Sequence, residues 1–501
     1  MMFHTIVTHE HPDLDAMLCC YLLKKYGSNR YQGLQEAKIL FCPAGRLPGG
    51  KTPDELEAEG ILAVDIGGGR LDTHPSGHSI SEEKKTLSAA NLVAKDLGVH
   101  DEERLESLLE FARIHDSLGK SLRSRNPIDH LMALPNLIRG ASFHFGTSFE
   151  NITTFFFKIF EAIEHAHSAT REDFFDNDSC VLSVHENTIF LPKKAHLRTL
   201  FACYLFKRYG EKEYNYSFDK PKDGTQQWHT IAEVISYCQL QEKQSLGKII
   251  DFVEQIKPQR FLLSSKFPMD ETVSLINIIR GFYAQHSDDL AQCIDEIFLL
   301  LDYIVAHEEN WYNAIAEYQE KRQLFTLRDA KVVVVSAKIG AVAKVARWLD
   351  KADLTVFHDE DKQHISVSVN RTGKLRKLRL GRLASKIRMA EININKEFAD
   401  VRTDNLQAIG EIAGWFLHQS EKLLIHGSPK AHREPSQIPF AVTTELILSE
   451  IEFEKKLPDM FCPKNKCLHK RCCFYTLRLP NCFHHRRLCE KKQNFNGKSK
   501  S

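Results

Sequence analysis

Two histidines and two aspartates lie within seven residues in the stretch HEHPDLD, which follows a short apolar run near the start of the chain. His9, Asp13 and Asp15 offer one imidazole and two carboxylates, which suit Mn²⁺ or Mg²⁺ better than an ion that prefers thiolates. Asp13 and Asp15 point in different directions from one helix start, so they could serve two neighbouring ions. Helix capping explains one aspartate at such a position, whereas metal binding accounts for all three residues.

Further acidic and histidine residues follow where the chain turns. Asp65 ends an apolar run before three consecutive glycines at 67–69, which permit a close backbone approach to a ligand. Asp72 and His74 come next, and Asp116 ends a helical pattern before a glycine turn. The structural alternatives are a strand-end turn for Asp65 and an exposed helix end for Asp116.

The elements that must position these residues alternate between strands and helices. Residues 4–8 and the runs AKILFCPA and ILAVDIGGG are expected strands, whereas 13–26, 86–98 and 102–118 have helical patterns. This alternation favours an α/β fold with a doubly wound, mainly parallel sheet. Ligands of such sheets bind beyond the carboxyl ends of the strands, where His9 and Asp65 lie.

The middle of the chain repeats its beginning in a degenerate form. Residues 187–210 align without a gap on 4–27, and NIIRG at 277–281 repeats NLIRG at 136–140. Where the first copy has His9, Asp13 and Asp15, the second has Pro192, His196 and Arg198. We interpret this pattern as an internal duplication in which only the first copy keeps the ligand residues. The alternative is a pair of amphipathic helices of similar composition.

We expect four regions along the chain. They are a metal-binding domain at 1–168, the degenerate repeat with long helices at 169–330, a compact α+β domain at 331–452, and a basic tail at 453–501. The tail contains candidate Zn²⁺ ligands: Cys462, Cys467, His469, Cys472, Cys482 and Cys489. It lacks a C-x-x-C pair, and a disordered basic tail is the commoner outcome for such a composition.

Composition restricts the partners and the location. The 501 residues have a net charge of +1, so no global charge favours a nucleic acid or a membrane. No run reaches the ~18 apolar residues of a membrane span, and the first residues lack the pattern of a signal peptide. We therefore expect a cytoplasmic protein without a membrane partner, and the sequence leaves its oligomeric state open.

Four motifs in order, HEHPDLDA, VDIGGG, LDTH and IHDSLG, resemble those of the DHH phosphoesterase superfamily. This superfamily includes family II inorganic pyrophosphatases, exopolyphosphatases, RecJ-type exonucleases, and oligoribonucleotide and cyclic-dinucleotide phosphodiesterases. The resemblance covers about the first 120 residues. It extends loosely to 331–452, where LLIHGSPKAHREP is similar to the family's substrate-binding turn.

The resemblance implies metal ligands at six positions: His9, Asp13, Asp15, Asp65, His74 and Asp116. Asp65 would bridge two ions, and Asp72 and His74 would act on the substrate. Thr73 departs from the family pattern because it replaces a histidine that is normally a ligand, so His74 or His78 would have to complete the second ion site. The implied substrate contacts are Arg371, Lys374, Gly427, Ser428, Lys430 and His432. For these residues the alternative is a solvated basic face or an ordinary polar loop.

The implied function is hydrolysis of a phosphoester or phosphoanhydride with one or two Mn²⁺ or Mg²⁺ ions and an activated water. The expected substrate is a phosphate-containing small molecule, above all a small nucleotide, or a short oligonucleotide. Thr73 supports a second hypothesis, a catalytically impaired nucleotide-binding or regulatory protein of the same fold. A third hypothesis is an interaction scaffold that uses the Cys/His tail.

Overall fold

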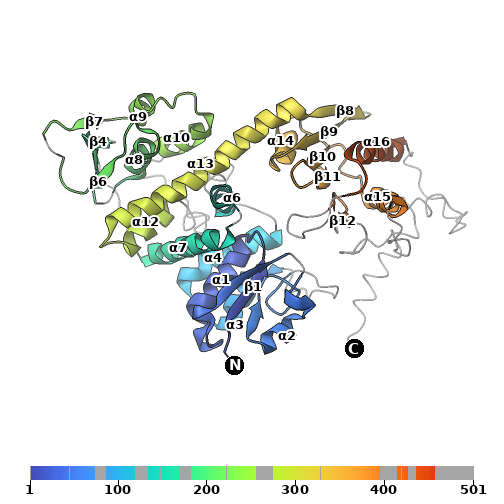
Figure 1. Cartoon of the computed structure of the whole chain (residues 1–501), viewed down its shortest axis with the longest axis horizontal. Coiled ribbons are helices and arrows are strands. Elements are labelled where there is room, and N and C mark those ends of the chain that lie inside the picture. Colours follow the sequence, from blue (N-terminus) through green and yellow to red (C-terminus); the bar gives the residue numbers. More distant parts are fainter. Residues whose placement is uncertain are drawn as a thin grey trace, which may run out of the picture. The chain divides into compact units, whose positions relative to one another are not determined.

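The computed structural model describes residues 2–43, 46–73, 86–118, 134–146, 148–168, 182–193, 195–221, 223–255, 275–327, 329–394, 415–418, 420–426 and 436–456. The chain forms two compact units, Met1–Tyr312 and Asn313–Ser501. Each unit contains both helices and sheets, and parallel strands occur in both, so the expected mixed α/β class is confirmed (Figure 1). None of the described helices combines the length and the apolar character that crossing a membrane requires.

A three-stranded parallel sheet opens the first unit. Its strands are β1 (Thr5–His9), β2 (Lys38–Cys42) and β3 (Ile61–Ala63), in the order β2-β1-β3. Helix α1 (Leu14–Tyr26) follows β1, and helix α2 (Pro53–Ala58) precedes β3. Val7 pairs with Leu40 on one side and with Ala63 on the other, so the carboxyl ends of β1 and β3 lie side by side.

Apolar side chains lie on both faces of this sheet. Ile6 belongs to a large core that it shares with α1, α3 (Ala89–Leu97) and α4 (Glu103–Leu118). Val7, the next residue, belongs to a small cluster with Cys42, Ala63 and Ile66. The period of two along β1 therefore separates two apolar layers, as a strand inside a sheet requires.

The second copy has elements at the positions that the alignment predicts. Helix α8 (Leu197–Tyr209) is 13 residues long, the same length as α1. Strand β5 (Thr188–Phe190) precedes α8 as β1 precedes α1. The N-cap side chains are also equivalent, because Asp13 accepts a hydrogen bond from Ala16 N and His196 accepts one from Arg198 N. The remaining elements of this region are β4 (Leu182–His185), β6 (Asn215–Ser217), β7 (Gln226–Trp228), α9 (Ile231–Tyr237) and α10 (Gln244–Gln255).

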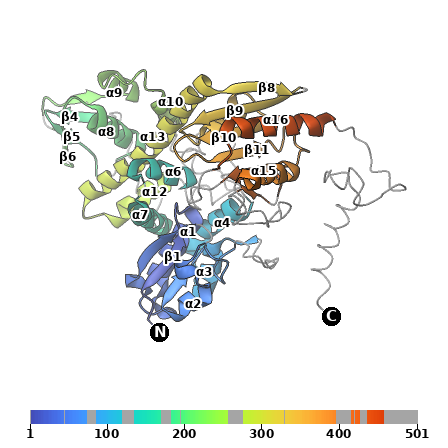
Figure 2. The same cartoon turned by 45° about the vertical axis from the view of Figure 1, so that its right-hand side comes forward.

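The two copies interlock through their longer helices, which are α6 (Leu134–Phe145) and α7 (Phe149–Ser168) in the first copy, and α12 (Leu275–Gln285) and α13 (Leu290–Lys321) in the second. A Cβ atom at Gly140 of α6 would lie 1.9 Å from the Tyr303 carbonyl oxygen of α13. A Cβ atom at Gly281 of α12 would lie 1.8 Å from the Ala162 carbonyl oxygen of α7. Each copy thus uses the glycine of its N-x-I-R-G motif to bring a helix backbone against the other copy (Figures 1 and 2).

This reciprocal contact supports the internal duplication and gives the second copy a structural role. The large core of the first unit runs from Phe3 to Val305, so the regions expected at 1–168 and 169–330 share one core.

The second unit is built on a six-stranded sheet in the order β12-β13-β11-β10-β9-β8. The strands are β8 (Gln323–Leu327), β9 (Ala330–Ala337), β10 (Leu354–Asp359), β11 (Ile365–Val369), β12 (Trp415–Leu417) and β13 (Leu423–His426). Within this described sheet only β9 and β10 pair in parallel, and α14 (Val342–Leu349) connects them. Helices α15 (Gly381–Ile394) and α16 (Phe440–Lys456) complete a separate core.

We expect Gly140→Ala and Gly281→Ala each to lower the free energy of unfolding by about 1–3 kcal/mol, because a methyl group there meets backbone that cannot rotate away. Gly247→Ala is the matched control: Gly247 also lies in a helix, and a Cβ atom added there would meet nothing within 4 Å beyond the backbone of its own helix and its chain neighbours. That change should be neutral or stabilise by up to about 1 kcal/mol. Urea unfolding measures all three; equal effects at 140, 281 and 247 would contradict the interlocked arrangement.

Candidate metal centre

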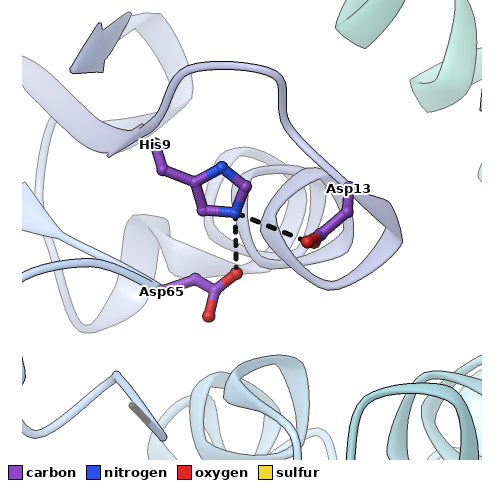
Figure 3. A group of neighbouring side chains, drawn as sticks. All are labelled: His9, Asp13 and Asp65. Atoms are coloured by element: carbon purple, nitrogen blue, oxygen red, sulfur yellow. Dashed lines mark ion pairs between the residues drawn. The ribbon is translucent and has the colours of Figure 1, made fainter. Parts of the chain in front are cut away.

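His9, Asp13 and Asp65 converge at the carboxyl end of the first sheet (Figure 3). His9 Nε2 lies 3.3 Å from Asp65 Oδ2 and 3.7 Å from Asp13 Oδ2, and the ligand atoms of all three residues lie within 4.8 Å of one another. Adjacent ligands of an octahedral ion with bonds of about 2.1 Å are about 3.0 Å apart. The spacing is therefore close to that of three ligands on a single ion.

Strand pairing brings His9 and Asp65 together although they lie far apart in the sequence. His9 is the last residue of β1, and Val64 N donates to Val7 O just beyond the end of β3, so the two strands stay paired up to the site. β2 and β3 flank β1 on opposite sides. In open α/β sheets, ligands bind beyond the carboxyl ends of the strands, at the point where the strands on either side of one strand are reached by connections that run in opposite directions.

The imidazole of His9 is oriented by its own loop. His9 is buried, and its Nδ1 lies 2.9 Å from the carbonyl oxygen of Glu10. Because a carbonyl oxygen can only accept, this contact places a proton on Nδ1, and in the neutral ring Nε2 then carries the lone pair. That lone pair is directed toward the carboxylates of Asp13 and Asp65, as a metal ligand requires.

The loop that carries Asp65 is held in a strained conformation. Asp65 has a φ of +53°, in the left-handed region that few side chains adopt, and its backbone N–H donates to Leu71 O. Such strain often marks a functional site, because the surrounding structure must maintain it. The buried carboxylate of Asp72 accepts a hydrogen bond of 2.6 Å from Gly68 N and so closes the glycine loop. Asp72 lies outside the group of three.

Asp15 also lies outside this group, although it is buried next to it. Its two carboxylate oxygens accept hydrogen bonds of 2.7 Å from Ala89 N and 2.9 Å from Ala90 N, at the start of α3. Burial raises the pKa of Asp15 well above its usual range, and the charges of Asp65 and Asp116 raise it further. The site therefore concentrates negative charge that a bound cation would offset.

The C-terminal end of α4 contributes groups near these carboxylates. Asp116 is exposed there and lies outside the group of three. Burial lowers the pKa of His115, the charge of Asp13 opposes this effect, and the charge of Arg139 adds to it. We did not predict His115 or Arg139 as site residues from the sequence. The signals that could have indicated them are the neighbour Asp116 for His115 and the repeated motif NLIRG for Arg139.

Several expected site residues lie outside the described part of the chain: His74, His78, Gly427, Ser428, Lys430, His432 and the Cys/His positions of the tail. Thr73 is described and is half-buried. Arg371 and Lys374 lie in the second unit, where Arg371 is exposed and Lys374 Nζ donates to Asp329 O at 2.8 Å.

The equivalent position of the second copy has different chemistry. His196 and Arg198 replace the two carboxylates, and burial together with the charge of Arg198 lowers the pKa of His196. Within the described ranges, His9, Asp13 and Asp65 form the one group of His, Cys, Asp or Glu side chains with a spacing suited to a metal ion.

No protein-family model matches the chain, and no curated protein sequence matches it. The DHH resemblance therefore stays a prediction based on its four motifs.

We expect Mn²⁺ to raise the thermal unfolding midpoint, because an ion that binds only the folded state stabilises it by about 2.7 kcal/mol at 100 times its Kd. Asp65→Asn should abolish this shift, and asparagine tolerates the left-handed backbone at 65. Glu296→Gln is the control, since Glu296 also pairs with a histidine, His286, at 2.8 Å but belongs to no such group. An unchanged Mn²⁺ shift in Asp65→Asn would contradict the assignment.

Proposed function

We propose that this chain is a metal-dependent phosphohydrolase of the DHH type, with a doubly wound catalytic domain, acting in the cytoplasm. One observation carries the proposal: Nε2 of His9 faces the carboxylates of Asp13 and Asp65 at the carboxyl end of a parallel sheet in which β2 and β3 flank β1. This donor set suits Mn²⁺ or Mg²⁺. The ordered motifs of the sequence favour phosphate chemistry over other uses of such an ion.

When bound, the ion would lower the pKa of a water molecule and neutralise charge on the phosphoryl oxygens. The residues of the chain have separate tasks around it. His9, held by Glu10 O, and Asp65, held by its strained turn, would fix the position of the ion. Asp13 would add a ligand from the start of α1, and Asp15 would keep α3 beside the site through Ala89 N and Ala90 N.

Arg139 is the candidate for contact with the phosphate. Its side chain reaches solvent, although partial burial lowers the pKa of the guanidinium. Asn136 Oδ1 accepts a hydrogen bond of 2.9 Å from its Nη1, which restrains the group. The charge of Arg139 lowers the pKa of His115, and the charge of Asp13 raises it. A guanidinium so placed would hold an anionic substrate that the carboxylates alone would repel.

The proposed substrates are a phosphoester or phosphoanhydride of a small nucleotide or a short oligonucleotide. The second candidate function, a regulatory protein that binds a nucleotide without cleaving it, is favoured by Thr73 in place of a usual ligand histidine. The two candidates share the metal site and differ in turnover.

We expect the protein with Mn²⁺ to hydrolyse at least one of bis-p-nitrophenyl phosphate, pyrophosphate and a short labelled oligonucleotide. Asp65→Asn should lower the rate at least about 100-fold, the scale of losing one charge-stabilising contact in an active site. Glu296→Gln should keep the rate. Turnover that persists in Asp65→Asn would refute the proposal, whereas absence of turnover with Mn²⁺ still bound would favour the regulatory protein.

A further inference from the structure

Asp65 belongs to a closed loop, residues 65–72, which lies just beyond β3 and which we call the ligand loop. Asp65 N donates to Leu71 O at 3.1 Å, and Gly68 N donates to the carboxylate of Asp72 at 2.6 Å. These two hydrogen bonds join the beginning of the loop to its end. The position of the Asp65 carboxylate therefore depends on how the end of the loop is held.

Arg70 connects the ligand loop to the helices around it. Its Nε and Nη2 lie 3.3 Å and 3.0 Å from the two carboxylate oxygens of Glu57 in α2. Its Nη1 lies 3.0 Å from Asp96 Oδ1 in α3, and its Nη2 also donates to the hydroxyl of the buried Tyr31. One guanidinium thus joins the loop to α2, to α3 and to the core.

These contacts form a network rather than a set of separate ion pairs. The two bonds to Glu57 fix the plane of the guanidinium, a geometry that a lysine ammonium cannot reproduce. The side chain of Asp96 is only 15% exposed, and its other oxygen accepts a hydrogen bond from the Tyr31 hydroxyl. A single exposed ion pair contributes little, whereas several charges in a network with bidentate geometry can hold a side chain in place.

The backbone of Asp65 requires such support. Its φ of +53° lies in the left-handed region, and a residue with a side chain keeps that conformation only when the surrounding structure imposes it. Leu71 follows Arg70 directly in the chain, so a fixed Arg70 also fixes the carbonyl oxygen that accepts from Asp65 N. Without this restraint the carboxylate of Asp65 would lose its fixed distance from His9.

We propose that Arg70 is a positioning residue for the candidate metal centre, because its contacts keep the ligand loop and the carboxylate of Asp65 in place. The inference rests on the proposed function, since it concerns a ligand of the proposed ion. The guanidinium is occupied by three protein partners, so its effect on the ion is indirect. Residues that orient a ligand from outside the coordination shell typically contribute about 10- to 100-fold to metal affinity.

The test compares Mn²⁺ binding to the full chain in Arg70→Gln and in a matched control, Arg30→Gln. Arg30 also pairs with Asp96, at 2.8 Å, and its Nε also donates to the Tyr31 hydroxyl, but it lies outside the ligand loop. We expect the Kd for Mn²⁺, measured by titration calorimetry, to rise at least about tenfold in Arg70→Gln and less than about twofold in Arg30→Gln.

Two further measurements separate positioning from general stability. Without added metal, hydrogen–deuterium exchange of the peptide that covers the ligand loop should be faster in Arg70→Gln than in Arg30→Gln or the unaltered protein. Glu57→Gln, which removes the bidentate partner, should also weaken Mn²⁺ binding. Combining it with Arg70→Gln should add nothing to the loss in Arg70→Gln alone, because both changes break the same contact.

Unchanged Mn²⁺ affinity in Arg70→Gln would overturn the positioning role and leave the metal centre intact. An equal loss of affinity in Arg30→Gln would also overturn it, because the effect would then belong to the contacts with Asp96 and Tyr31 and not to the ligand loop. If the unaltered protein bound no Mn²⁺, the proposed metal centre itself would fail, and the positioning role with it. The unaltered protein therefore distinguishes the two failures.

Discussion

The parallel pairing of β1 with β3 is the constraint on which the candidate site depends. It brings the end of one strand beside the end of another, and so places the imidazole of His9 3.3 Å from the carboxylate of Asp65. Asp13 joins them because α1 begins directly beyond the loop. Its Oδ1 caps α1 through Ala16 N, while its Oδ2 faces His9. Helix capping and ligand geometry are therefore compatible in one side chain.

Comparison of the two copies distinguishes the residues that the fold requires from those that would bind a metal ion. It keeps the helix length, the N-cap contact and the glycine that lets one helix touch the other copy. It has lost the carboxylates, and its Arg198 would repel a cation. Because Gly140 and Gly281 lie in reciprocal contacts, the first copy obtains part of its core from the second. This dependence explains why a copy without ligand residues would still be required for the fold.

Local features of the site could be predicted from the sequence, and the features set by tertiary contacts could not. The spacing of His9 and Asp13 around a helix start is local, and the aligned repeat predicted the position of α8. The role of Asp15 depends on where α3 begins, far along the chain, and the hydrogen bonds at Ala89 N and Ala90 N show it holding the first turn of that helix. Likewise, Arg139 and His115 lie on different helices and influence each other only through the tertiary structure, so no sequence spacing predicts this pair.

Crystals grown with Mn²⁺ would test the metal centre most directly, through the anomalous scattering of that ion. We expect an anomalous peak within bonding distance of His9 Nε2 and of carboxylate oxygens of Asp13 and Asp65. A structure with Mn²⁺ bound elsewhere, and with the imidazole of His9 paired directly to the two carboxylates, would show that these residues form an ion pair and would contradict a metal centre at this site.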